Sequence, residues 1–175
     1  QIPHLFERVS VLDNVLTGMY RRDKYSIFDA IFRTPRYLKA NSRSVAEAKA
    51  LLSLAGMLGM EELAAGSISH GQKRLLEVIR AVATEPKILI LDEPATGLTQ
   101  DEMHSLTSLI RTLAAGGMCV VLIEHNVAFL MDLADIVTVI QSGKVIAEGT
   151  PQAVQKDERV LEAYLGNTDF SKELA

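Results

Sequence analysis

The stretch Lys87-Ile88-Leu89-Ile90-Leu91-Asp92-Glu93-Pro94 decides the fold class of this sequence. Its apolar run is typical of a strand that is buried on both faces of a sheet. Two carboxylates follow the run directly, and ligands of open α/β sheets bind just beyond the carboxyl ends of the strands. The acidic pair therefore suits a nucleotide site, although a bare Asp-Glu pair without the apolar run would be better explained as a solvated turn.

The residues after this stretch predict a helix and a second strand of the same kind. Residues 101–113 place apolar side chains on one helical face. Thr99 and Glu102 have the spacing of a capping box at its start, and the Gly-Gly pair at 116–117 ends it. A second apolar run follows at 118–123. Because strand, helix and strand form a βαβ unit, we expect the two strands to be parallel and buried in one sheet.

The rest of the chain predicts helices before this region and a hairpin after it. Residues 1–83 are rich in helix formers and contain no convincing strand. Residues 136–147 hold two short β-branched runs on either side of a Ser142-Gly143 turn, which is typical of a β-hairpin. Pro151 begins a helical stretch that runs to about Leu165, and residues 166–175 look like a frayed tail.

Composition narrows the class of protein. The 175 residues are 48% hydrophobic and 23% charged, enough for one domain with a hydrophobic core. The net charge of −4 argues against general affinity for nucleic acid. With Cys119 as the one cysteine, no internal disulfide can form, and a reducing compartment fits best. No apolar run approaches the length of a bilayer crossing, no signal peptide opens the chain, and the first residue is not methionine, so we expect the sequence to begin inside a gene.

A second candidate site is the segment Ser67-Ile68-Ser69-His70-Gly71-Gln72, which precedes a helical stretch with Lys73, Arg74 and Arg80. A small glycine-containing loop at a helix start offers free backbone N–H groups and the positive end of the helix dipole to an anion. Taken alone, the segment is better explained as an ordinary helix start with Ser69 as its N-cap.

A third candidate is His125, directly after the second predicted strand. A lone histidine is more often structural than catalytic. Parallel strands end at the same edge of a sheet, however, so we expect this histidine to lie near Asp92 and Glu93 and to take part in the same site.

In their order and spacing, these segments resemble the ATP-binding cassette (ABC) ATPase family over essentially the whole chain. The matching motifs are the Q-loop at 1–15 with Gln1 as the metal-sensing glutamine, the signature at 69–72, the Walker B strand at 87–93, the D-loop at 95–98 and the switch histidine His125.

The resemblance implies an α/β fold, a partial P-loop (RecA-like) core with a helical subdomain, and ATP and Mg²⁺ as cofactors. It implies that Glu93 is the general base and that His125 contacts the γ-phosphate. Asp92 and Gln1 would hold the metal, partly through water. The signature would contact ATP bound to a second copy, through Ser69, His70, Gly71 and Gln72.

Two features depart from the family pattern. His70 stands where the commonest signature has glycine. More seriously, no Gly-x-x-x-x-Gly-Lys-Ser/Thr occurs, so the Walker A loop that cradles the phosphates is absent. Because that loop precedes the Q-loop in the family, we expect the N-terminal part of the core to be missing from this chain, and the chain alone to be inactive.

The family pattern also implies a division of the chain. Residues 1–15 form the Q-loop and connection, 16–84 a helical subdomain that ends in the signature helix, 85–150 the α/β core, and 151–175 a C-terminal helix and tail.

Finer features resemble the ATPase subunits of branched-chain amino acid importers, notably the long segment between Q-loop and signature, Ile123-Glu124-His125-Asn126 and the ending from Gly149 to Gly166. This implies a peripheral subunit at the cytoplasmic face of the cell membrane that couples ATP hydrolysis to solute import. Its partners would be a second ATPase subunit, transmembrane permease subunits and, indirectly, a solute-binding protein, with no nucleic acid. The alternatives are the ATPase of a urea or amide importer, a non-hydrolysing module that docks on a membrane subunit, and a soluble ABC ATPase that acts on DNA or ribosomes.

One further segment, residues 20–43, carries seven basic and two acidic residues, a net charge of +5, with aromatic residues between them. Such a segment can contact nucleic acid, an anionic membrane surface or a partner protein. It can equally be an ordinary amphipathic helix pair with a solvated basic face. The family resemblance places it in the helical subdomain that docks on the membrane-spanning subunit.

Overall fold

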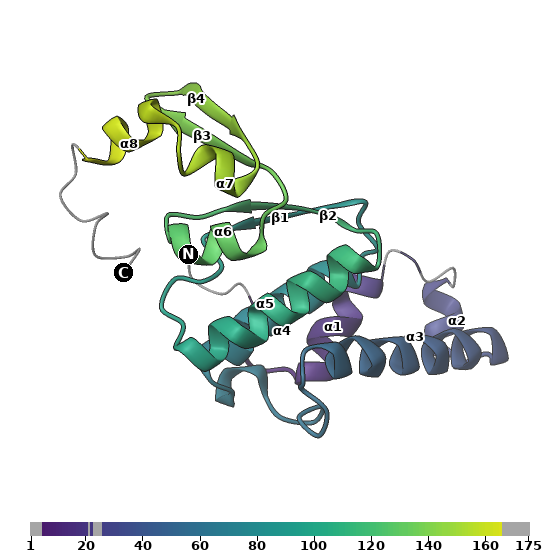
Figure 1. The fold of residues 1–175 in the computed structure, drawn as a ribbon. Helices are drawn as coiled ribbons and strands as arrows, with labels where there is room; N and C mark the ends of the chain where they lie inside the picture. The colour runs from purple at the N-terminus through teal and green to yellow at the C-terminus, as the bar shows by residue number, and fades with distance from the viewer. Residues whose placement is uncertain (1–4, 21, 23–25, 166–175) are drawn as a thin grey trace. The chain divides into compact units, whose positions relative to one another are not determined.

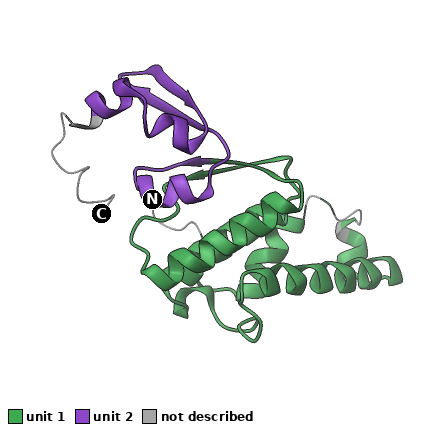
Figure 2. Cartoon of the chain, viewed as in Figure 1, with its two compact units in different colours: residues 1–121 green, residues 122–175 purple. Residues whose placement is uncertain are grey.

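The computed structural model describes residues 5–20, 22 and 26–165 and consists of helices and two small sheets (Figure 1). The chain forms two compact units, residues 1–121 and 122–175 (Figure 2). The boundary between these units differs from the predicted boundaries after residues 15, 84 and 150. The predicted division into four parts stays a prediction.

The first unit begins with helices α1 (Val11–Met19), α2 (Ile27–Ile31), α3 (Pro35–Leu54) and α4 (His70–Val82), and a short 3-10 helix at Ala65–Ser67. Each of these four α-helices starts at a hydroxyl side chain that accepts a hydrogen bond from a backbone N–H of the first turn. These N-caps are Ser10, Ser26, Thr34 and Ser69. They satisfy amide groups that a helix leaves unpaired at its start. The prediction of helices without a strand up to residue 83 is confirmed for the described residues.

The core of this helical part lies where α1 meets α3 and α4. Its fully buried apolar side chains include Val11, Val15, Leu52, Leu76 and Ile79. Gly18 allows α1 to approach α4 closely, because a Cβ at this position would stand 2.4 Å from the carbonyl oxygen of Arg80.

Arg22, which follows α1, contacts the middle of α3 and the end of α4. Its guanidinium pairs with Glu47 of α3 at 2.9 Å and with Glu85, and donates to the carbonyl oxygen of Ala83 at 3.2 Å. Ala83 is the C-cap of α4, where the helix dipole favours a positive charge.

The predicted strand, helix and strand are present as β1 (Ile88–Asp92), α5 (Gln100–Ala115) and β2 (Cys119–Ile123), and the two strands are neighbours in one sheet. The expectation that both strands are buried on both faces is wrong, since no residue of β2 is fully buried and β1 is buried on one face only. Leu89 and Leu91 are buried, whereas Ile88 and Ile90 are 56% and 64% exposed. Successive side chains of a strand point to opposite faces, and only one face of β1 packs against the described part of the chain.

The second unit contains the predicted hairpin. β3 (Val137–Gln141) and β4 (Lys144–Gly149) pair antiparallel. Ser142 and Gly143 form the turn with φ of 49° and 76°. Helices α6 (Val127–Leu133), α7 (Pro151–Val154) and α8 (Glu158–Leu165) complete the unit. Its buried apolar core consists of Val137, Ala147, Val154 and Val160.

The helical stretch predicted from Pro151 to about Leu165 is present, but it is divided into two helices, α7 and α8, that are separated at residues 155–157. The Asp157 carboxylate accepts a hydrogen bond from the backbone N–H of Arg159 at 2.9 Å and so starts a new helix. Among the described residues, no helix has both the length and the apolarity that crossing a membrane requires.

Candidate nucleotide site

The end of β1 presents the two carboxylates in different environments. Asp92, its last residue, is exposed, and Glu93 is half-buried. Glu93 has a φ of 44°, a conformation that costs a non-glycine residue about 1–3 kcal/mol and that concentrates at functional sites. The Thr96 hydroxyl donates to its carboxylate at 3.5 Å, a long hydrogen bond.

The start of α4 has the predicted N-cap. Ser69 Oγ accepts from the Gln72 N–H at 3.2 Å, and Gln72 Oε1 accepts from the Ser69 N–H at 2.9 Å. This capping box is reciprocal and fixes the shape of the loop.

A carboxylate from α5 lies at the same helix start. Glu102 Oε1 accepts from Gly71 N–H and from Ser69 Oγ, both at 3.1 Å. Its Oε2 accepts from Thr99 N–H at 3.1 Å and from Thr99 Oγ1 at 3.2 Å. These donors stabilise the charged form, so the pKa of Glu102 lies below its ordinary value of 4.5, with the Thr99 N–H as the largest cause. One carboxylate thus caps α5 and binds the start of α4.

This contact shows which chemistry the signature loop supports. A hydroxyl and a backbone N–H converge on one oxyanion at the positive end of a helix, and the same donors suit a phosphate oxygen. Gly71 leaves the space for that oxyanion, because a Cβ there would lie 2.2 Å from the Glu102 carboxyl carbon. His70 lies close to the predicted D-loop, since a Cβ on Gly97 would stand 3.6 Å from its Nε2.

The structure therefore brings the predicted signature residues 69–72 together with the segment from Gly97 to Glu102. Two other predicted site residues are not placed with them. Gln1 lies outside the described residues. His125 belongs to the second unit, just before Asn126, which caps α6, and its approach to Glu93 stays a prediction.

Among the described residues, a metal ion at the end of β1 would be held by few protein ligands. In the part of the chain that the structure describes, no three His, Cys, Asp or Glu side chains gather into a metal site. Mg²⁺ is usually held by one or two carboxylates together with waters and phosphate oxygens. The exposed Asp92 carboxylate at the end of β1 fits such a set, so these residues suit Mg²⁺ that arrives with a nucleotide.

Sequence reasoning missed the second contact of Glu102, which is its contact with the start of α4. Its spacing from Thr99 predicted the cap of α5, which is confirmed. Its bond to Ser69 joins residues 33 positions apart, and no local pattern carries that information.

Comparison with known proteins gives matches over both ends of the chain. A family model described as ABC transporter matches residues 1–96. A model described as branched-chain amino acid ATP-binding cassette transporter matches residues 144–169.

Individual relatives agree with these models. LivG of Escherichia coli, a high-affinity branched-chain amino acid transport ATP-binding protein, is 33% identical over 163 residues, covering 93% of this chain and 64% of LivG. BraF of Pseudomonas aeruginosa, with the same description, is 32% identical with the same coverage. A solved ATP-binding cassette of an ABC transporter, in its ADP conformation, superposes with a TM-score of 0.75 at 29% identity, over 95% of this chain and 66% of that one. The chain thus spans 64% of the length of these two relatives.

Proposed function

This chain belongs to the ABC transporter family, and from that membership we propose that it is part of the ATP-hydrolysing subunit of an importer for branched-chain amino acids. The observation that carries the proposal is the likeness to LivG and BraF over 93% of the chain. The separate match of residues 144–169 to a branched-chain amino acid model supports the same solute. These matches favour branched-chain amino acids over urea or amides.

In the proposed subunit, Glu93 accepts the proton of the water that attacks the γ-phosphate, and His125 contacts that phosphate. Asp92 would hold Mg²⁺ together with Gln1. When bound, Mg²⁺ neutralises charge on the phosphates. The strained backbone and partial burial of Glu93 support a functional role. The presence of both Glu93 and His125 argues against a module that only docks and does not hydrolyse ATP.

The signature loop serves the nucleotide of a second copy in this proposal. Ser69 Oγ and Gly71 N–H are the donors, with His70 and Gln72 beside them. In the single chain both donors are bonded to Glu102. Phosphate binding therefore requires the Glu102 carboxylate to release them, and the two like charges would repel one another if it stayed.

The proposal is tested by uptake in cells that lack the gene. Expression of the wild-type protein should restore uptake of radiolabelled leucine, isoleucine and valine, and Glu93→Gln at the same protein level should not. Urea and acetamide uptake should be unchanged in all strains. Restored urea uptake without leucine uptake would show that the protein belongs to a urea or amide importer. Full rescue by Glu93→Gln would contradict ATP-driven transport.

A further inference from the structure

Helix α2 exposes a cluster of large apolar side chains. Phe28, Ile31 and Phe32 are 72%, 67% and 74% exposed. Their spacing of three and four residues places them on one face of the helix. Single exposed apolar residues are ordinary on protein surfaces, but a contiguous group is typical of a contact site.

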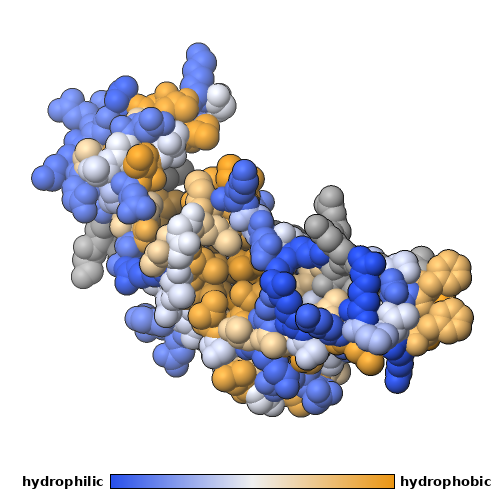
Figure 3. All heavy atoms as spheres, turned by 90° about the vertical axis from the view of Figure 1, so that its right-hand side faces the viewer, coloured by the Kyte–Doolittle hydropathy of each residue, from blue (hydrophilic) through white to orange (hydrophobic). Residues whose placement is uncertain are grey.

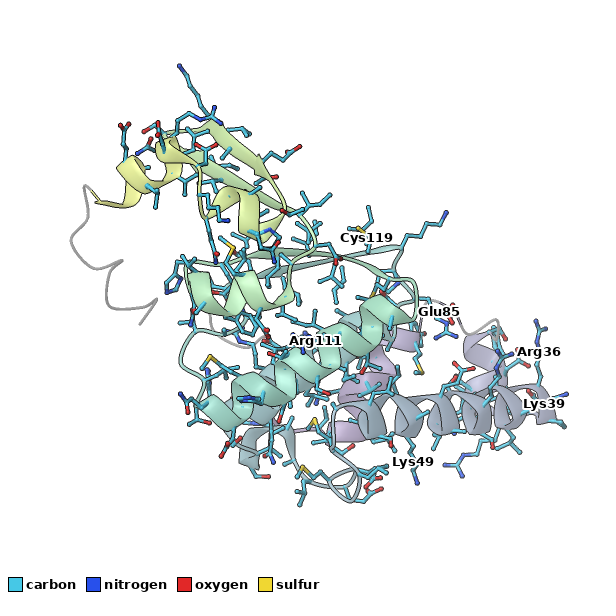
Figure 4. The ribbon with its side chains drawn as sticks, viewed as in Figure 1. Arg36, Lys39, Lys49, Glu85, Arg111 and Cys119 are labelled. Atoms are coloured by element: carbon cyan, nitrogen blue, oxygen red, sulfur yellow. The ribbon has the colours of Figure 1, made fainter. Side chains whose placement is uncertain are left out.

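Basic side chains flank this cluster. Arg33 follows Phe32 directly, and Arg36 and Lys39 lie in the first turns of α3. All three are exposed. Figure 4 labels Arg36 and Lys39 at the end of α3 that lies next to α2. Figure 3, which faces this end of the molecule, shows hydrophobic side chains beside strongly hydrophilic ones.

Asp29 is the one acidic residue among residues 26–42, against three basic residues, which leaves a net charge of 3 − 1 = +2. Its carboxylate accepts from the Ser26 N–H at 2.9 Å and from Thr34 Oγ1 at 2.9 Å. The Ser26 N–H is the largest cause that holds the pKa of Asp29 below its ordinary value. Asp29 thus connects Ser26 and Thr34, the N-cap residues of α2 and α3.

We propose that this α2 surface, made of Phe28, Ile31, Phe32, Arg33, Arg36 and Lys39, contacts a bilayer that contains anionic phospholipids. The apolar side chains enter the headgroup region, and the basic side chains pair with lipid phosphates. Apolar area combined with basic charge is what holds peripheral helices in a membrane interface, and phenylalanine is typical of the apolar face of such helices.

Charge complementarity favours lipid over a protein partner. The centre of a protein interface is depleted of lysine and of most other charged residues, arginine excepted, whereas Arg33, Arg36 and Lys39 follow the apolar cluster with a single carboxylate, Asp29, among residues 26–42. A plane of anionic headgroups accommodates such a mixture without a matching hollow. The inference does not depend on ATP hydrolysis or on the solute.

The test measures vesicle binding by the protein as the cell produces it, purified away from its membrane subunits. We expect flotation with phosphatidylglycerol–phosphatidylethanolamine vesicles, little with phosphatidylcholine vesicles, and loss of binding at high salt. Arg36→Gln with Lys39→Gln should weaken binding by about 30-fold, from the energy of two basic residues near an anionic surface. Phe28→Ser with Phe32→Ser should also release the protein.

A matched control changes exposed residues elsewhere in the same unit, Lys49→Gln with Leu58→Ser. It should bind like wild type, and thermal unfolding should show that every variant is folded. The proposal is overturned if wild type does not bind the anionic vesicles, or if the α2 variants bind as well as the control. It is also overturned if the α2 variants keep vesicle binding and lose only co-purification with the membrane subunits, because the surface would then be a protein interface. Failure of amino acid uptake would leave each of these results unchanged.

Discussion

Glu93 combines a carboxylate at the end of a strand with a φ of 44°, which glutamate does not favour. Glu93→Gln keeps the size of the side chain and removes the proton acceptor. We therefore expect unchanged ATP affinity in the complete protein and a fall in hydrolysis of about 100-fold or more. Nucleotide titration measures the ATP affinity, and phosphate release measures the hydrolysis rate. Near-normal hydrolysis would show that Glu93 is not the general base.

Glu93→Gly is a companion variant, because glycine adopts this φ without strain. It should also lose hydrolysis, but it should unfold at higher denaturant concentration than wild type.

Glu102 gives a prediction that depends on pH. Its pKa is lower in the folded chain than in the unfolded chain, so its contribution to stability is present above the ordinary pKa of 4.5 and is lost as the pH falls through and below that value. Glu102→Gln should be less stable than wild type at neutral pH, and the difference should shrink on acidification. Denaturant unfolding from pH 7 to pH 3 measures this. A difference that is the same at every pH, or equal to that of the exposed Glu62→Gln control, would speak against the bond network.

At the scale of elements, the sequence predicted what local signals control. Ser69 gave the start of α4, Thr99 and Glu102 the start of α5, and the Ser142-Gly143 turn the hairpin, because each is a short-range backbone preference. The break between α7 and α8 was missed because the helical pattern continues across it and Asp157 acts as a new cap.

Contacts between elements could not be predicted in the same way. The apolar run of β1 indicates that the strand can be covered on both faces. It does not indicate whether this chain supplies both covering layers, so the burial of Ile88 and Ile90 was predicted wrongly. The bond from Ser69 to Glu102 depends on how α4 packs against α5, which no short pattern encodes. The sequence therefore predicted which types of residue form the site, but it did not predict the bond between Ser69 and Glu102.

Arg22 tests the packing of α1, α3 and α4. Arg22→Ala removes bonds to Glu47, Glu85 and the Ala83 carbonyl oxygen. Because the side chain is partly exposed, we expect a loss of only about 1–2 kcal/mol, which lowers the melting temperature by roughly 2–8 °C. Calorimetry of Arg22→Ala beside the exposed Lys49→Ala measures it. Equal melting temperatures for both variants would show that these bonds contribute nothing to stability.

At the scale of the whole molecule, the open face of β1 predicts how the 175-residue chain behaves alone. Ile88 and Ile90 are more than half exposed, and covering the exposed part would stabilise each by about 1–2 kcal/mol. We expect the chain to self-associate, and Ile88→Ser with Ile90→Ser to make it more monomeric by light scattering. Leu89→Ser, on the buried face, should unfold it instead. A monodisperse wild-type monomer would show that this face is stable in water.

We propose that Glu93 of one copy and Ser69 of another complete one ATPase site. Ser69→Arg places a large side chain in the signature loop, so this variant and Glu93→Gln should each hydrolyse almost no ATP as homodimers. Mixed dimers of the two contain one site with an intact Glu93 and an intact Ser69 from different chains. The decisive measurement is phosphate release from co-expressed, dual-tagged mixed dimers of the complete protein. We predict clear recovery of activity above either variant alone, whereas mixed dimers as inactive as both parents would contradict a site shared between two copies.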